Sequence, residues 1–470
     1  MLRKHSILHA ILRKYLGPLA LAAVAPGLLL AGTASWAAGK KVEPPVRLID
    51  SMAVPVSATN TTKGMYSFDI SFVDQSTGTY YLADRSNKAV DTADVGVAIV
   101  TQIFPNNGHA AFAGFVPCSP PAGANDCAGP NGVVAAFPWL FVTDAPSRVL
   151  TFDLRFNPPK TVSECFTKTV LGVPEKTRAD ELAYDPQDGL ILAINNASSP
   201  PFGTLVAVDK TTGALTCGTN IIFDAAHGVD AQNGAEQPVW DPGTKKFYLS
   251  IPQISGNPTV GGVLRISKTG TVEATYTVKF CSPAGLALGP SEDLLVGCNT
   301  IWDTAGAKWT TNADRDTGTA APQLVILDAK TGGITANVRG AGVGDEVWFN
   351  KGDNHYYAAS SGSNLAPNAI TPARPPNGTA LAAPVLTAQG AATLDVIDAL
   401  SETLDQRVPT LNVPATVAPD TNPHPAGTAH SVAADAFTNH VFVPIGANNA
   451  VPNCLTGCIT VYARSDPDSD

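Results

Sequence analysis

Residues 235–252 read A-E-Q-P-V-W-D-P-G-T-K-K-F-Y-L-S-I-P, and this stretch decides the fold. An acidic residue precedes a short apolar run, a D-P-G-T tetrapeptide begins at Asp241, and a second apolar run follows to Ile251. The tetrapeptide is rich in residues that favour tight turns. Two short hydrophobic strands separated by such a turn predict a β-hairpin.

The same phrase recurs along the chain. Further copies begin near Ser67, Ala179, Gly344 and Ala429, a weaker copy spans residues 283–296, and a divergent copy starts at Asn131. Most units hold several short strand candidates, and the units repeat at a spacing of roughly 45–60 residues, which is typical of propeller blades. The sequence therefore predicts an all-β fold, a seven-bladed β-propeller. The alternative is a six-bladed ring in which the Asn131 unit merges with its neighbour.

The chain ends are predicted to meet in one blade. The last unit offers only three strands, whereas residues 46–49 form an isolated strand candidate far away in sequence. Adding this strand to the last unit would close the circle and remove an exposed sheet edge. The expected organisation is a signal peptide at 1–37, an N-terminal segment with the closing strand at 38–66, the propeller at 67–464 and a flexible tail at 465–470.

The first 37 residues have the pattern of a secretory signal peptide. A basic beginning is followed by an apolar segment at 16–30 and by small residues at Ser35 and Ala37, which favours cleavage before Ala38. About 15 apolar residues are fewer than the ~20 that a membrane-spanning helix needs. We expect a periplasmic or secreted protein with no membrane span after cleavage.

The charge of the chain limits its partners. The formal net charge is −10, and the signal segment holds four basic and no acidic residues, so its removal would leave about −14. A strongly acidic surface disfavours nucleic acid and anionic membranes. The expected partner is a small-molecule substrate or ligand, and the expected state is a monomer.

Eight cysteines fit an oxidising compartment. Their positions relative to the predicted strands suggest four disulfides. The expected pairs are 118–127, 165–217, 281–298 and 454–458.

The starting residues of the innermost strands are the candidate site, because these strands line the channel of a propeller. Aligning the repeats places one set of residues at the first position, namely Asp69, Asn131, Asp180, Glu236, Ala284, Asp345 and His430. The second position holds Ile70, Gly132, Glu181, Gln237, Gly285, Glu346 and Ser431. Carboxylates that converge repel one another unless a cation or protons intervene.

This ring predicts a divalent metal ion, with Ca²⁺, Mg²⁺ or Zn²⁺ as candidates. The expected ligands are Asp69, Asp180, Glu181, Glu236, Asp345 and His430. The alternative is that the acids only satisfy free backbone N–H groups. A second set of acids, Asp74, Asp185, Asp241 and Asp435, falls in the hairpin turns and is predicted to form Asx turns.

Proton transfer at this ring is assigned to His430, Glu346 and His227. His227 lies in a loop that leads to an inner strand, as does His109, and either loop could reach the same mouth. Asn195 and Asn196, at the end of a second strand, are candidate amide ligands.

Three repeats carry a resemblance to known propellers. They are Phe68-Asp69-Ile70-Ser71-Phe72-Val73-Asp74, Ala429-His430-Ser431-Val432-Ala433-Ala434-Asp435 and Asn131-Gly132-Val133-Val134. Their pattern resembles the SMP-30/gluconolactonase, NHL and YVTN propellers. The SMP-30 resemblance implies a lactone hydrolase with a divalent cation at the channel mouth, with Glu236, Asp345 and Asp69 as acidic ligands and Asn195 or Asn196 as the amide. Virginiamycin-lyase-like propellers, which use His and Glu with Mg²⁺, are also similar.

Two functions from different classes follow. The first is a metal-dependent hydrolase of a lactone or small ester, or a metal-dependent lyase, with the cation lowering the pKa of a bound water. The second is a non-catalytic propeller that binds a small ligand, a metal or a protein partner, since the fold alone does not separate these. Long insertions at residues 300–322 and 364–390 could cover either kind of site.

Overall fold

The computed structural model describes residues 43–96, 99–115, 118, 125–167, 175–309, 321–362, 392–410, 430–448 and 451–465. A single compact unit begins at Pro44. The predicted signal peptide, most of the predicted tail, the insertion at 364–390 and the centre of the insertion at 300–322 lie outside the described residues. Within the described part, no helix has the length and hydrophobicity of a membrane span.

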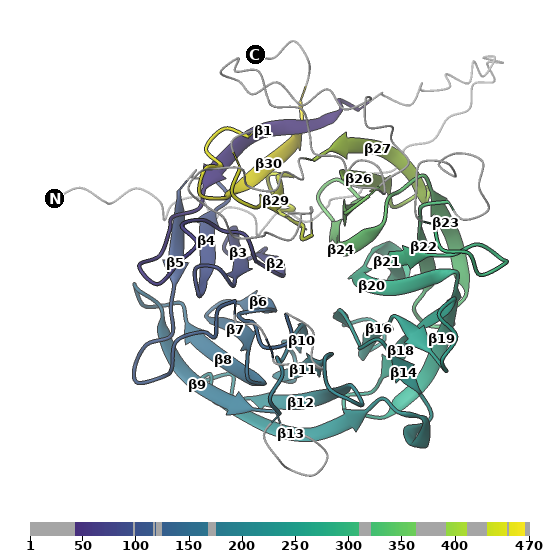
Figure 1. The fold of residues 1–470 in the computed structure, drawn as a ribbon, viewed down its shortest axis with the longest axis horizontal. Helices are drawn as coiled ribbons and strands as arrows, with labels where there is room; N and C mark the ends of the chain where they lie inside the picture. Colours follow the sequence, from purple (N-terminus) through teal and green to yellow (C-terminus); the bar gives the residue numbers. More distant parts are fainter. Residues whose placement is uncertain are drawn as a thin grey trace, which may run out of the picture. The chain divides into compact units, whose positions relative to one another are not determined.

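Seven four-stranded antiparallel sheets surround a central axis (Figure 1), so the seven-bladed prediction is confirmed and the six-bladed alternative is wrong. Blades 1 to 3 comprise β2 (Ser71–Asp74), β3 (Thr79–Asp84), β4 (Ala89–Asp94), β5 (Val100–Ile103); β6 (Val133–Ala136), β7 (Trp139–Asp144), β8 (Arg148–Asp153), β9 (Lys160–Phe166); β10 (Leu182–Asp185), β11 (Leu190–Asn195), β12 (Phe202–Val208) and β13 (Leu215–Ile222). The divergent Asn131 repeat is therefore a blade of its own.

Blades 4 to 7 continue the ring. They comprise β15 (Pro238–Asp241), β16 (Lys246–Ile251), β18 (Val260–Ile266), β19 (Val272–Lys279); β20 (Cys281–Leu288), β21 (Asp293–Ile301), β22 (Gln323–Asp328), β23 (Ile334–Arg339); β24 (Gly344–Asn350), β25 (His355–Ser360), β26 (Thr393–Asp398), β27 (Thr403–Pro409); β28 (Ala433–Ala434), β29 (Val441–Ile445), β30 (Cys458–Arg464) and β1 (Val46–Ala53). The outer strands β23 and β27 are absent from the sequence prediction, because their polar, half-exposed residues give a weak hydrophobic pattern.

Two kinds of short element add to the seven sheets in the described part of the chain. A side hairpin pairs β14 (Ala231–Gln232) with β17 (Gln253–Ile254). Single 3₁₀ turns form at η1 (Ala225–His227) and η2 (Pro290–Glu292).

The hairpin turns are built as the repeat phrase predicts. In blade 4, Asp241 pairs with Lys246 across β15 and β16, and the backbone N–H of Gly243 donates to Asp241 Oδ1 at 2.8 Å. The equivalent side-chain oxygens of Asp74, Asp185 and Asp435 accept from backbone N–H groups two or three residues on, at 2.9, 2.9 and 2.7 Å. The Asx-turn prediction is confirmed for all four residues.

The core consists of apolar layers between neighbouring blades. Among the described residues, each of seven buried clusters draws its members from two adjacent sheets. Phe141 of blade 2 and Tyr184 of blade 3, for example, pack with their ring centroids 4.7 Å apart. Each sheet is therefore buried on both faces, which explains the long runs of buried residues in its second and third strands.

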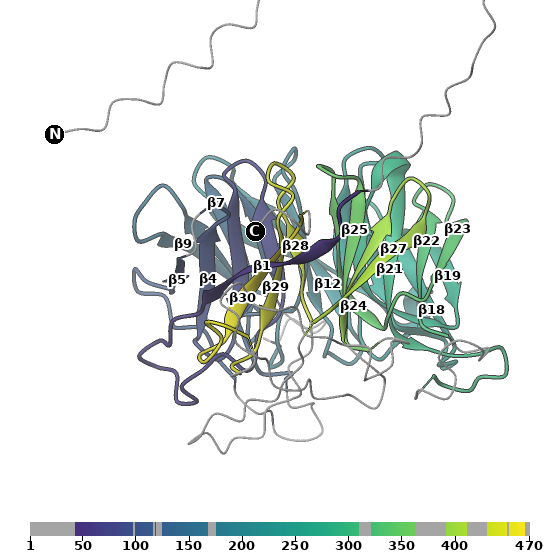
Figure 2. The same cartoon turned by 90° about the horizontal axis from the view of Figure 1, so that it is seen from above.

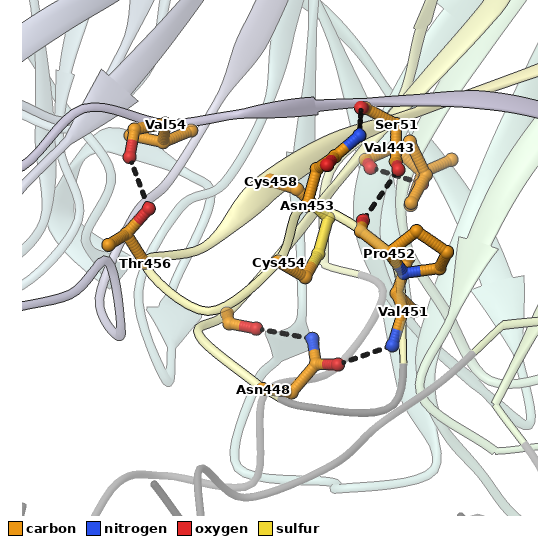
Figure 3. Close-up of a disulfide and its surroundings, with 12 residues drawn as sticks. Ser51, Val54, Val443, Asn448, Val451, Pro452, Asn453, Cys454, Thr456 and Cys458 are labelled. Atoms are coloured by element: carbon orange, nitrogen blue, oxygen red, sulfur yellow. Dashed lines mark hydrogen bonds between the residues drawn. A yellow bond between two sulfur atoms is a disulfide. The ribbon is translucent and has the colours of Figure 1, made fainter. Parts of the chain in front are cut away.

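The ring closes as expected, by the N-terminal strand. β1 pairs antiparallel with β30, from Val46 opposite Arg464 to Ala53 opposite Cys458. The loop between β29 and β30 contacts β1 and the residue after it (Figure 3): Asn453 Nδ2 donates to Ser51 O at 3.0 Å, and Thr456 Oγ1 donates to Val54 O at 2.7 Å. Seen from above, β1 crosses the outside of the last blade (Figure 2).

All four predicted disulfides form. They are Cys118–Cys127, Cys165–Cys217, Cys281–Cys298 and Cys454–Cys458, and the described chain has no free cysteine. Cys165 on β9 and Cys217 on β13 join the outer strands of blades 2 and 3. Four disulfides fit an oxidising compartment.

Candidate functional site

The innermost strands begin at one end of the channel, here called the ring mouth, and turn back at the other, here called the hairpin mouth. The first-position residues gather at the ring mouth, as predicted. Glycines at the second position allow neighbouring inner strands to approach closely. A Cβ on Gly132 would lie 2.7 Å from the carbonyl oxygen of Asp180, which accepts a backbone hydrogen bond from Gly132 at 3.0 Å.

His430 links two acids across three blades. Its Nε2 lies 2.9 Å from Asp69 Oδ1 and its Nδ1 lies 2.8 Å from Asp345 Oδ2. Burial disfavours the charged imidazole, but Asp345 and Asp69 outweigh it and hold the pKa of His430 well above its ordinary value. The raised pKa favours the imidazolium form of His430 at neutral pH, in which both nitrogens donate to the facing carboxylates.

Two buried arginines continue this chain of charges. Arg85 pairs with Asp69 Oδ2, lies 4.0 Å from Asp180 Oδ1 and donates from Nε to Asn131 Oδ1 at 2.9 Å. Arg178 Nη2 lies 2.9 Å from the other oxygen of Asp180. The result is an alternating series, here called the salt-bridge ring: Asp345, His430, Asp69, Arg85, Asp180 and Arg178.

The salt-bridge ring is balanced in formal charge, with three aspartates against three cations. Burial raises the pKa of Asp69, but Arg85 and His430 overcome it and lower the value to about 2. For Asp180, burial outweighs Arg178 and raises the pKa to about 6, which leaves the group mostly ionised at pH 7.

Three glutamates next to this ring are left without a cation of their own. Burial, then repulsion from Asp180 and Asp345, raises the pKa of Glu236 to about 8. Burial also holds the pKa values of Glu181 and Glu346 well above the ordinary range; repulsion from Glu346 adds to the effect at Glu181, whereas His430 opposes it at Glu346. The raised pKa values favour the protonated form of all three glutamates at neutral pH, and protonation relieves the predicted repulsion.

Glu346 and Glu181 differ in their partners. Gln237 Nε2 donates to Glu346 Oε2 at 2.9 Å, and Gln237 Oε1 accepts from the backbone N–H of Leu286 at 2.6 Å. Glu181 is 7% exposed, and its Oε2 has no hydrogen-bond partner in the described part of the chain.

A cavity of about 350 Å³ occupies the channel beneath the salt-bridge ring. Glu181, Gln237 and Ile70 line its inner end, and apolar residues of the inner strands form its walls. Its other end reaches the hairpin mouth, where its lining is aromatic: Phe72, Tyr184, Trp240, Trp348 and Phe349. The size lies at the lower end of the range for small-molecule sites.

The donor atoms of this arrangement do not fit the predicted divalent cation. A metal-bound imidazole needs a free nitrogen lone pair, yet both nitrogens of His430 face carboxylates. Both oxygens of Asp69 are taken by His430 and Arg85. Within the described residues, no three His, Cys, Asp or Glu side chains form a group that could hold a metal ion.

The remaining candidates have other surroundings. His227 is on η1 with its side chain 58% exposed, and its Nδ1 lies 2.6 Å from Asp224 Oδ1. His109 pairs with Glu164 of the outer strand β9 at 3.3 Å. Asn195 donates to Ser147 Oγ and Arg178 O and accepts from Thr167, whereas Asn196 accepts from Arg178 at 3.4 Å. His227 and His109 therefore contact acids outside the salt-bridge ring, whereas Asn195 contacts the backbone of Arg178 and Asn196 its side chain.

Sequence reasoning missed Arg85 and Arg178. A signal was present, because Arg85 follows the acidic end of a second strand and Arg178 precedes Asp180 by two residues. Basic residues so close to the acids of a predicted ring indicate internal ion pairs.

Comparison with known proteins supports the fold alone. No family model and no curated protein matches this chain. A chain in the crystal structure of the mitotic checkpoint complex is similar, with a TM-score of 0.53 and 9% identity over 97% of this chain and 100% of that one. Kuenenia stuttgartiensis hydrazine synthase is also similar, with a TM-score of 0.54 and 12% identity over 88% of this chain and 99% of that one.

Proposed function

We propose that this protein is an exported propeller that binds a small molecule in its central channel. The observation that carries the proposal is the cavity of about 350 Å³ with a buried carboxyl oxygen, Glu181 Oε2, that has no partner among the described residues. Buried polar atoms are nearly always hydrogen-bonded, so an unpartnered one on a residue that lines a cavity is a candidate partner for a ligand group. The salt-bridge ring supports this site by fixing the inner strands from which Glu181 and Gln237 project.

A second candidate is hydrolysis of a lactone or small ester, the activity that the SMP-30 resemblance implies. Glu236 supports it, because a half-buried carboxyl with a pKa of about 8 can donate a proton at neutral pH. The donor set gives no support to a metal in this role. The acid–base version of the hypothesis therefore rests on Glu236 and on the His430–Asp345 pair.

The test is a binding screen with the mature protein and a variant whose channel is filled. Val239 lines the cavity and is only partly buried, so Val239→Trp is expected to occupy the channel while the blades still fold. A panel of small amphiphiles, lactones and esters would be followed by thermal shift and calorimetry, with hydrolysis assayed in parallel. Binding by the native protein that Val239→Trp abolishes supports the proposal. A panel without a single binder, or unchanged binding by a folded Val239→Trp variant, would overturn it.

A further inference from the structure

The channel cavity has two chemically different ends. At its inner end lie Glu181 and Gln237, and at the hairpin mouth lie the aromatic side chains of blades 1, 3, 4 and 6. Phe72 and Trp348 stand edge to face there, with ring centroids 5.3 Å apart. The salt-bridge residues do not line the cavity, so a ligand would enter from the hairpin mouth and stop at Glu181.

The inner end has surplus acid. The cations Arg85, Arg178 and His430 already face Asp69, Asp180 and Asp345. Glu181 and Glu346 have no cation in contact with them within the described part of the chain. The polar group that this end lacks is a hydrogen-bond donor with positive charge.

The walls favour the same chemistry. Aromatic faces attract organic cations as they pass, and apolar walls bind the hydrocarbon part of a ligand. The protein as a whole carries a formal charge of −10, which steers cations towards it.

We propose that the channel binds an elongated organic amine, with its ammonium group against Glu181 and its apolar body between the aromatic residues of the hairpin mouth. The inference rests on the proposed function and names the class of ligand. The salt bridge forms when Glu181 loses its proton to solvent, so one ammonium is bound and one proton is released. The ammonium keeps all its own protons and donates up to three hydrogen bonds, one of them to the Glu181 carboxylate.

The charged and titratable groups around Glu181 come from five blades. They are Asp69 and Arg85 of blade 1, Arg178 and Asp180 of blade 3, Glu236 of blade 4, Asp345 and Glu346 of blade 6, and His430 of blade 7. Burial and the repulsion from Glu346 and Asp180 keep Glu181 protonated in the empty site, since its pKa is raised. Amine binding should therefore tighten as the pH rises from 6 to 8, until the amine itself begins to lose its charge.

The experiment compares three probes of one shape: 4-phenylbutylamine, 4-phenylbutanol and 4-phenylbutyrate. Calorimetry at pH 7.5 in buffers of different ionisation enthalpy gives both affinity and proton release. We expect the amine to bind about 10-fold or more tightly than the alcohol, with release of close to one proton, and the butyrate to bind weakest. Glu181→Gln should weaken amine binding about 10- to 100-fold and change alcohol binding less than about 3-fold.

Glu273→Gln is the matched control, because Glu273 is on the outer strand β19 and pairs with Lys246 and Arg265 at the surface. It should leave all three affinities unchanged. Proton release is measured on the native protein, so the test survives a Glu181 variant that does not fold. Equal binding of amine and alcohol without proton release would overturn the amine assignment and leave the proposed channel site intact. Failure of all three probes, together with a panel that contains no binder, would overturn both.

Discussion

Replacing Arg85 with methionine should strongly destabilise the protein. Arg85 is 3% exposed, and its guanidinium contacts Asp69, Asp180 and Asn131. The fall in the pKa of Asp69 from 3.8 to about 2 corresponds to about 2.4 kcal/mol of favourable interaction, shared between Arg85 and His430. Leaving Asn131 Oδ1 without its donor adds about 1–3 kcal/mol. We expect a loss of about 3–5 kcal/mol, the usual effect of removing one partner of a buried ion pair.

The assay is urea unfolding followed by tryptophan fluorescence, at pH 7 and at pH 3. The Asp69 carboxylate, whose pKa is lowered, stabilises the folded state above pH 3.8, and this stabilisation is lost as the pH falls towards 2. The difference in stability between the native protein and Arg85→Met should therefore be smaller at pH 3 than at pH 7. Lys268→Met is the control, because Lys268 pairs with Asp188 at the exposed surface and its loss should not be measurable. A deficit below about 1 kcal/mol at pH 7, or an equal deficit at both pH values, would refute the assignment of Arg85 as the counterion of the ring.

Three further predictions concern the ring and the disulfides. Glu236 keeps, in the folded state, a proton that the unfolded chain releases above pH 4.5. The free energy of unfolding should therefore fall by about 1.4 kcal/mol per pH unit between pH 5 and 8 because of this residue. When unfolding is measured at several pH values, Glu236→Gln should show a smaller dependence of this free energy on pH. The stabilisation from His430 is fully present below pH 6.5 and fades only as the pH rises through its raised pKa, so its NMR signals should report an imidazolium at pH 7.5, and a neutral ring would contradict this. Replacing Cys165 and Cys217 by serine should lower the free energy of unfolding by about 4 kcal/mol, because their disulfide spans 52 residues. The same change at the pair in Figure 3, Cys454 and Cys458, which spans 4 residues, should lower it by about 2 kcal/mol. Equal losses in urea unfolding would be inconsistent with stabilisation through chain entropy.

Most of the fold was readable from the sequence because the hairpin phrase combines two independent signals. Apolar runs mark the buried inner strands, and an acid that caps its own turn marks the point where they reverse, as at Asp241. The outer strands are harder to predict, because apolar and polar residues alternate only weakly in β23 and most of its residues are exposed. The closing strand is predictable because the last repeat holds only three strands, so that a strand from elsewhere in the chain must complete its sheet. This is a constraint of topology rather than of local sequence.

The ring could be predicted only in part. Register along the repeats places Asp69, Asp180 and His430 at one mouth, and the structure brings these three together in one ion-pair chain. Register does not say which cation neutralises the acids. Arg85 enters from the end of a second strand and Arg178 from the residues before β10, outside the aligned positions of the repeat. These two arginines and His430 face the aspartates of the ring.

The closing strand also sets the order in which the molecule can be completed. Contacts between β1 and the rest of the last blade join residues 402 positions apart, such as Asn453 with Ser51. On a ribosome or through a translocation channel, β1 emerges first and must wait for β30, so its hydrogen-bonding edge stays open for nearly the whole of synthesis. During that time β1 is an unpaired strand whose edge can pair with another chain. In a chain shortened by the last blade, β1 would stay unpaired permanently. A holding factor that covers this edge would therefore be most useful before the final few dozen residues appear.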